Sequence, residues 1–468
     1  MIRNLSTSVM AVAVATGWAL PAQAQSTSSA AIQVELADMR AQMARMAQRI
    51  DTLEGQLAAA NTKVEAAQAA VQAIPAQAAP AVTAAAVTAT AKPATEITWD
   101  GAPKLTGAGG WSFKPRGRLQ VDVAGVNGPA AIGSKSLGVG TEFRRAYIGF
   151  DGTMPGGFGY RVEADLANSG VELTDVYLTY KANPKLTVTV GQHKAFDSLE
   201  DMGSDLFTSF MERAAFNSAF GFERRVGLSA TYQGKQVLVQ GGVFSDNIAD
   251  LSADSNNSYS LDGRVVFMPK LGHAQLHLGG SIHYRDFNDA ATTTRYRARP
   301  FVHTTDVRLI DTKAFSASGE RNYGLEAAYI AGRFHATAES HWMTALRPGL
   351  ADPTFNGGYA EVGYLLTEDS TAYKGGAYDR IRPKSPLGKG GFGAVQINAR
   401  YDWLDLNSTG IIGGRQQVAG ASLVWIPTDY VRFVLNYGHL WINDAAVAAG
   451  TAKAYGADAL GLRAQFDF

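Results

Sequence analysis

The 468-residue chain has no cysteine, and its 42 basic residues are balanced by 42 acidic residues. The absence of thiols is compatible with an oxidising compartment. The balanced charge excludes the net basic footprint of a nucleic-acid-binding protein, so no nucleic-acid partner is expected. Nucleophile elbows, phosphate loops and zinc-binding signatures are also lacking. We therefore predict that the chain is not an enzyme and has no catalytic residues, metal or other cofactor.

Long apolar runs are missing after the N-terminal segment, although 46% of all residues are apolar. A water-soluble protein of this length would bury a large core and would show apolar runs or helical stripes. Beyond about residue 100 the dominant pattern is instead an alternation of apolar and polar residues. This pattern favours strands with two different faces over an ordinary soluble core.

The first residues, MIRNLSTSVMAVAVATGWALPAQAQ, have the organisation of a secretory signal peptide. Arg3 supplies the positive charge, Val9–Leu20 is mostly apolar, and Ala22-Gln23-Ala24 is a small-x-small cleavage site. A membrane anchor is the alternative, but the apolar stretch is shorter than the roughly 20 residues that span a bilayer. We predict a signal peptide over residues 1–24 and export of the remainder.

Residues 25–74 carry a heptad pattern with apolar or small residues at alternating spacings of three and four. These positions are Ile32, Leu36, Met39, Met43, Met46, Ile50, Leu53, Leu57, Ala60, Val64, Ala67, Val71 and Ile74. The pattern predicts a coiled coil and therefore an oligomer, whereas a lone amphipathic helix would show a broader stripe. Opposite charges at flanking positions, Glu35 with Arg40 and Arg49 with Glu54, favour parallel chains. The Ala/Pro-rich residues 75–98 form a linker.

For residues 99–468 we predict an all-β transmembrane barrel of about sixteen antiparallel strands. The segment YRVEADLA is typical, because Val162, Ala164 and Leu166 alternate with charged neighbours. Strands of roughly eight to twelve residues, aromatic residues near strand ends and short turns that alternate with long loops favour a barrel over a sandwich. Since every backbone group in lipid needs a partner, the sheet must close. The terminal LRAQFDF should close it, with Leu462 and Phe466 towards lipid and Arg463 towards the lumen.

The connection after His193, HKAFDSLEDMGSDLFTSFMERAAFNSAFGFE, is too apolar for a free surface loop. We predict that it folds into the lumen as a constriction loop with Lys194 and Arg213; packing outside the barrel is the alternative. The loop also has an acidic surplus that would repel anions unless wall arginines pair with it. The acidic residues are Asp197, Glu200, Asp201, Asp205 and Glu212.

Alternation places many arginines on the lumen side of the wall. They are Arg116, Arg118, Arg145, Arg161, Arg225, Arg264, Arg285, Arg400, Arg432 and Arg463. Guanidinium groups attract anions and bind phosphate by paired hydrogen bonds. Carboxylates of the same parity leave open a general pore in which paired charges only keep the lumen wet.

A later loop, DAATTTRYRARPFVHTTDVRLIDTK, is basic and extracellular on the strand count. Its arginines Arg295, Arg297, Arg299 and Arg308 would gather anions at the mouth or bridge lipopolysaccharide phosphates. His335, Glu339 and His341 share the inward parity of one strand, but no spacing provides a third metal ligand or a nucleophile.

The barrel region resembles the phosphate-selective porins O and P of Gram-negative outer membranes. The resemblance is carried by FKPRGRLQVDVAGV, by EFRRAYIGFDGTMPGGFGYRVEADLANSGVELTDVYLTYK and by VGQHKAFDSLEDMGSDLFTSFMER. Its most specific part is YLLTEDSTAYKGGAYDRIRPKSPLGKGGFGAVQINARYDWLDL, with Tyr373-Lys374, Pro383, Gly393-Ala394 and Arg400-Tyr401 in family order.

The resemblance implies a homotrimer of sixteen-stranded barrels that lets small anionic solutes diffuse passively. It implies that Lys194 and Arg213 belong to the constriction and that Arg145, Arg161 and Arg225 belong to an arginine ladder on the wall. We therefore expect an outer-membrane porin that favours phosphate or polyphosphate, with its coiled coil in the periplasm. A general or sugar-type porin, and a structural barrel whose coiled coil contacts peptidoglycan, are the alternatives. A lipase-like barrel would need a Ser/His pair on the lipid-facing parity.

Overall fold

A computed structural model describes residues 95–133, 137–167, 170–251 and 255–468. The predicted signal peptide, coiled coil and nearly all of the linker lie outside these residues. The last linker residues, 95–98, belong to strand β1 (Thr95–Asp100). Within the described part of the chain, no helix is both long and apolar enough to cross a membrane.

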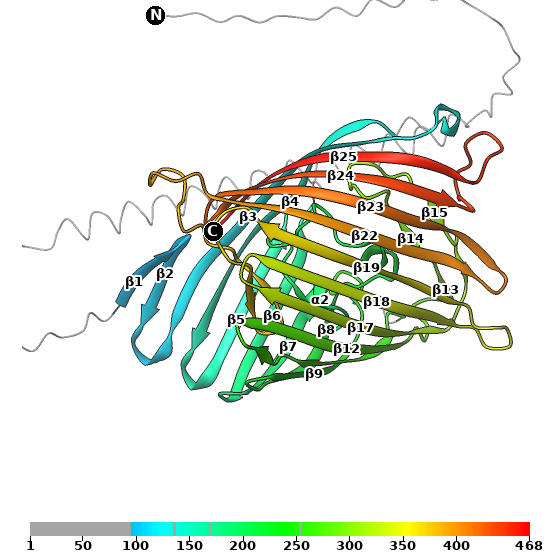
Figure 1. Ribbon diagram of the computed structural model, residues 1–468. Helices are drawn as coiled ribbons and strands as arrows, with labels where there is room; N and C mark the ends of the chain where they lie inside the picture. The colour runs from blue at the N-terminus through cyan, green and yellow to red at the C-terminus, as the bar shows by residue number, and fades with distance from the viewer. Residues whose placement is uncertain (1–94, 134–136, 168–169, 252–254) are drawn as a thin grey trace, which may run out of the picture. The chain divides into compact units, whose positions relative to one another are not determined.

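Sixteen strands of the described residues form a closed antiparallel barrel (Figure 1). Each strand pairs with the next, and β25 pairs with β3 to complete the ring. The strands are β3 (Ser112–Asn127), β4 (Val139–Met154), β5 (Phe158–Asp165), β6 (Glu172–Asn183), β7 (Leu186–Lys194), β8 (Arg224–Gln233), β9 (Val237–Phe244), β10 (Tyr259–Phe267), β12 (Ala274–Asp286), β17 (Gly319–Ala331), β18 (Phe334–Leu346), β19 (Thr354–Leu365), β22 (Ala394–Ser408), β23 (Ile411–Thr428), β24 (Val431–Asn443) and β25 (Tyr455–Asp467). The predicted fold of the barrel is confirmed.

The strands have an apolar outer face and a polar inner face, as the alternation predicts. In β25, Leu462 and Phe466 are each 48% exposed, whereas Arg463 and Asp467 between and beyond them are buried. Apolar side chains on the outside suit lipid, and closure leaves no unpaired strand edge within the ring. The last residues therefore form the closing strand.

Short turns join the strands at one end of the barrel, which we call the turn end, and most long connections lie at the opposite loop end. The turns after β4, β6, β8, β17 and β23 belong to the turn end. The hairpin of β1 and β2 (Ala102–Gly107) and the end of β25 lie at the same end of the barrel (Figure 1). One turn-end connection is long: residues 366–393, the turn-end segment, include β20 (Ala372–Lys374) and β21 (Ala377–Asp379).

Three connections fold into the barrel and fill part of it. The inner loop, residues 195–223, contains α2 (Leu199–Met202) and α3 (Ala215–Ala219). The capping loop, residues 287–318, contains β13 (Thr293–Thr294), β14 (Arg297–Ala298), β15 (Ile310–Asp311) and β16 (Phe315–Ser316). The turn-end segment enters from the other side, where Tyr373 Oη lies 2.7 Å from His277 Nδ1 of β12 and Arg264 donates to the carbonyl of Gly376.

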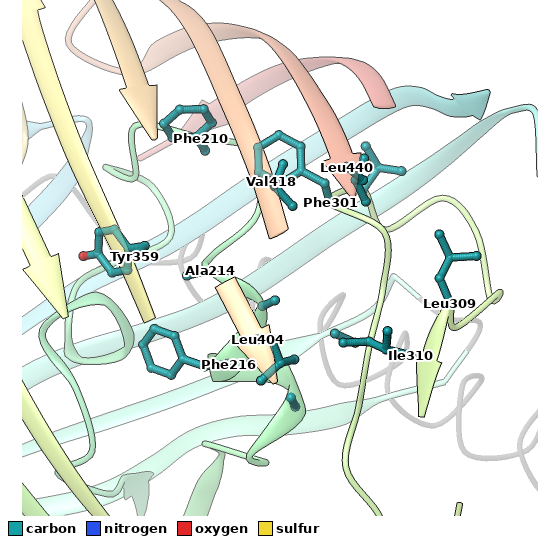
Figure 2. Close-up of a cluster of buried hydrophobic side chains, with 14 of the residues drawn as sticks. Phe210, Ala214, Phe216, Phe301, Leu309, Ile310, Tyr359, Leu404, Val418 and Leu440 are labelled. Atoms are coloured by element: carbon teal, nitrogen blue, oxygen red, sulfur yellow. The ribbon is translucent and has the colours of Figure 1, made fainter. Parts of the chain in front are cut away.

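The inner and capping loops share an apolar cluster inside the barrel (Figure 2). Phe210 of the inner loop and Phe301 of the capping loop have ring centroids 5.9 Å apart. Phe301 packs against Gly420 and Gly438, where added Cβ atoms would lie 2.8 and 2.5 Å from its ring. The capping loop therefore lies at the loop end. Its charge alone suggests a loop that stands free in solvent, but its buried apolar residues hold it inside the barrel wall.

Candidate permeation pathway

Wall carboxylates fix the inner loop by its two short helices. Glu339 of β18 accepts hydrogen bonds from the backbone N–H groups of Leu199 and Glu200, at 2.8 and 2.9 Å. Asp402 of β22 accepts one from Ala215 N at 2.8 Å. These carboxylates occupy the places of capping groups at the first turns of α2 and α3. The loop is thus held across the lumen by side chains from the wall.

Wall arginines pair with three acidic residues of the inner loop, Glu200, Asp205 and Glu212. Asp205 pairs with Arg118 and Arg145, and the Arg145 contact is 2.5 Å long. Burial opposes ionisation of Asp205, but Arg118 and Arg145 outweigh it and hold the pKa of this carboxyl well below its usual range. The carboxylate is therefore ionised and paired at neutral pH.

Two further acids of the inner loop also contact wall arginines, although burial raises the pKa of Glu200 to about 7. Glu212 contacts Arg144 at 2.9 Å and Arg463 at 2.7 Å, and Glu200 contacts Arg400 at 2.6 Å. Burial disfavours the charge of Glu212, but Arg144 and Arg463 hold its pKa well below its usual range. Asp205 and Glu212 are thus ionised and compensated by wall arginines in the folded barrel.

Lys194 and Arg213, the two residues predicted for the constriction, come together on backbone carbonyls. Both donate to the carbonyl oxygens of Asp201 and Gly203, and each lies 3.0 Å from the Gly203 oxygen. The nearest ion pair of Arg213 is a 3.7 Å contact with the Asp201 carboxylate. Carbonyl groups orient both side chains without cancelling the charge of the Arg213 guanidinium, so the site keeps a positive potential.

A cavity of about 370 Å³ lies on the loop-end side of the inner loop. Its charged lining has six arginines against three carboxylates. The arginines are Arg144, Arg145, Arg213, Arg297, Arg299 and Arg308, and the carboxylates belong to Asp201, Glu212 and Asp402. Three of these arginines come from the capping loop, which places its charge at the mouth.

A second cavity of about 460 Å³ lies on the turn-end side. Nine lysines and arginines line it against five carboxylates. The cations are Lys114, Arg116, Arg118, Arg145, Arg161, Lys194, Arg213, Arg224 and Arg380. Among the described residues, only Arg145 and Arg213 line both cavities. These two guanidinium groups therefore lie at the boundary of both cavities.

Four predicted site residues lie away from both cavities. Arg400 is buried between Glu200 and Glu361, Arg285 pairs with Asp246, and Arg225 lies 3.6 Å from Glu223. Arg295 of the capping loop is held by Asp311. Arg225, Arg285 and Arg400 point inward, as parity predicts. Each of them forms an ion pair with an acidic residue instead of lining either of the two cavities.

Sequence reasoning missed four cations that line the cavities: Lys114, Arg144, Arg224 and Arg380. In the ladder of β3 and β4, Gln120 pairs with Arg145 and Val121 with Phe143, so Arg144 is an extra residue. Because of this bulge, both Arg144 and Arg145 face acidic residues of the inner loop. Strict alternation would place one of the two on the outer face of the barrel. The doubled arginines at 144–145 and 224–225 were the available signal; Arg380 lies in the turn-end segment, where alternation gives no parity.

A closed barrel of sixteen strands, apolar outside and lined by charged cavities inside, defines an outer-membrane porin. The chain belongs to the family of phosphate-selective porins O and P, whose family model matches residues 113–468. A protein of Caulobacter vibrioides is 45% identical over 451 residues, which cover 94% of this chain and 90% of that protein. This similarity extends well beyond the residues that the family model matches.

Solved structures share the fold at low identity. OmpT, an outer membrane protein of Vibrio cholerae, has a TM-score of 0.50 and 11% identity, and the match covers 80% of this chain and all of that one. The trimer form of in-vitro folded OmpT has a TM-score of 0.50 and 12% identity, covering 77% of this chain and all of that one.

Proposed function

We propose that the protein is an anion-favouring porin for passive diffusion of phosphate or polyphosphate. The observation that carries the proposal is that Arg145 and Arg213 line both cavities, so a solute that crosses the barrel passes two guanidinium groups. The description of the family as phosphate-selective supports the same solute class.

The charge balance of both cavities supports the sign of the selectivity. Cations exceed carboxylates in each cavity, and part of the carboxylates is already paired with wall arginines. A surplus of positive charge in a narrow space of low dielectric raises the local concentration of anions. Guanidinium groups also match phosphate geometry with two parallel hydrogen bonds.

The proposal predicts that Arg145→Gln and Arg213→Gln each lower the anion-to-cation permeability ratio. The measurement is the reversal potential of the purified protein in a planar bilayer under a KCl gradient, followed by addition of phosphate. In the wild type we expect an anion-selective sign and a phosphate-dependent decrease of the chloride current. Arg295→Gln is the matched control, because Arg295 lies outside both cavities.

A cation-selective wild type would overturn the anion preference. Anion selectivity without any effect of phosphate would leave a general anion porin and remove the phosphate proposal. Unchanged selectivity in both arginine variants would show that the passage does not run between Arg145 and Arg213.

For the complete chain we further propose a homotrimer whose turn end faces the periplasm together with the coiled coil of residues 25–74. The trimer form of the structurally similar OmpT and the heptad pattern support this arrangement.

Deletion of residues 26–90 separates two roles of the helix. Loss of trimers in native electrophoresis would identify an assembly device, whereas intact trimers with lost envelope attachment would identify a peptidoglycan anchor. If the arginines of the capping loop bind lipopolysaccharide, this lipid should remain bound to the protein after purification.

A further inference from the structure

One buried group of side chains inside the barrel combines the donor atoms of a metal site. It consists of Asp197 at the start of the inner loop, Asp262 of β10 and His283 of β12, with one ligand atom from each residue within 4.8 Å of the others. All three residues are buried. The group lies outside the linings of the loop-end and turn-end cavities. The diffusion of solutes through the two cavities does not involve these three side chains.

The two wall residues of this group have partners, but the loop residue does not. His283 Nδ1 lies 2.5 Å from Asp262 Oδ1, and Ser260 donates to Asp262 Oδ2 at 2.7 Å. Asp197 is only 4% exposed. Its carboxylate nevertheless accepts no hydrogen bond from the residues that the structure describes. A buried carboxylate without a donor is costly, and either protonation or a bound cation lowers that cost.

The position of Asp197 is fixed by its backbone. Its carbonyl oxygen accepts a 2.5 Å hydrogen bond from Ser281 of β12, which holds the loop against the strand that carries His283. The carboxylate therefore faces Asp262 and His283 because of main-chain anchoring, with no ion pair to place it there. This is the arrangement expected when a further group binds between loop and wall.

Neighbouring cations are engaged with other acids. Arg285 contacts Asp246 at 2.5 Å and Glu320 at 3.9 Å, and Arg225 contacts Glu223 at 3.6 Å. Glu320 also lies 3.8 Å from His283 Nε2. The positive field of Arg225, whose Nη1 has no hydrogen-bond partner among the described residues, reaches Asp197, but no hydrogen bond joins them. Carboxylates therefore outnumber guanidinium groups around the imidazole.

We propose that Asp197, Asp262 and His283 bind a divalent transition-metal ion of the zinc type. Two carboxylate oxygens and an imidazole nitrogen suit zinc better than calcium or magnesium, which prefer oxygen ligands alone. The bound ion would join the start of the inner loop to β10 and β12, three residues after Lys194. It is a structural cross-link of the loop rather than part of the solute path.

The test uses the full chain without a histidine tag, purified in detergent and treated with a chelator, with Zn²⁺ alone as the probe. Isothermal titration calorimetry should show one site per chain, and the melting temperature should rise with added Zn²⁺. Asp197→Asn keeps the shape of the side chain and leaves the wall pair of Asp262 and His283 in place. We expect this variant to bind Zn²⁺ at least tenfold more weakly.

His439→Gln is the matched control, because His439 pairs with Asp458 in an exposed position on the barrel and lies outside the group. Its Zn²⁺ affinity should equal that of the wild type. Absence of a stoichiometric site in the wild type, or equal affinity in Asp197→Asn, would overturn the proposal. His283→Gln, checked for folding by heat-modifiable electrophoresis, should lose the site as well; retained binding would also overturn it. Ion selectivity is not used as a readout, so failure here leaves the porin proposal untouched.

Discussion

At the scale of single residues, the pairing of acids with arginines explains how a loop rich in carboxylates can lie in a pathway for anions. Asp205 forms ion pairs with both Arg118 and Arg145. Its carboxylate therefore adds no unpaired negative charge to the lumen. Arg213 is instead oriented by carbonyl oxygens of the loop, and its only ion pair among the described residues is the 3.7 Å contact with Asp201. The selectivity of such a lumen depends on which charges are left unpaired, not on the composition of the loop.

Asp205→Asn should therefore increase the anion-to-cation permeability ratio, since it leaves Arg118 and Arg145 without their shared carboxylate. Reversal potentials under a KCl gradient give the measurement, and single-channel conductance shows whether the loop stays in place. Glu368→Gln is a suitable control, because Glu368 lies in the exposed part of the turn-end segment. A fall in the ratio would contradict the assignment of Asp205 as a neutralising partner.

The same residue predicts a flat pH dependence. Because the pKa of Asp205 is lowered in the folded barrel, its stabilising contribution is fully present above its unfolded pKa of about 4. That contribution is lost only as the pH falls through the still lower folded value. We expect the selectivity of the wild type to change little through Asp205 between pH 8 and pH 5. A steep change there that Asp205→Asn abolishes would contradict the lowered pKa.

At the scale of elements, alternation predicted the strands and their inward arginines because a barrel wall has a strict period of two. It failed where the period breaks, as at the bulge that turns both Arg144 and Arg145 inward. It also gave no account of the capping loop, whose Phe301 packs against Gly420 and Gly438 of distant strands. Contacts between residues far apart in sequence are set by the closed ring, and a local pattern does not contain them.

The attachment of the inner loop to Glu339 can be tested at this scale. In Glu339→Gln, an amide NH₂ replaces one of the oxygens that accept from Leu199 N and Glu200 N. One backbone donor then loses its acceptor, which costs about 1–3 kcal/mol. The cost falls on docking of the loop, so we expect more frequent current fluctuations in single-channel records while the barrel remains folded in electrophoresis. Records as quiet as those of a Glu368→Gln control would show that the clamp is dispensable.

At the scale of the whole molecule, the ring closes between β25 and β3, and its outer face must match the membrane. Leu462 lies opposite Leu435 of β24 and Val123 of β3, and all three are exposed on the outer face. An arginine on the lipid-facing side near the bilayer midplane costs about 2–4 kcal/mol. Leu462→Arg should therefore lower the yield of folded barrel in phospholipid vesicles and its free energy of unfolding in urea.

Leu350→Arg is the matched control, because Leu350 is equally apolar and exposed but lies in the connection between β18 and β19 at the loop end. Water can solvate an arginine there, so folding yield and stability should equal those of the wild type. If Leu462→Arg folded as well as Leu350→Arg, the outer face of β25 would not lie in lipid. The difference between the two variants thus measures the membrane contact of the closing strand separately from the general effect of exchanging leucine for arginine.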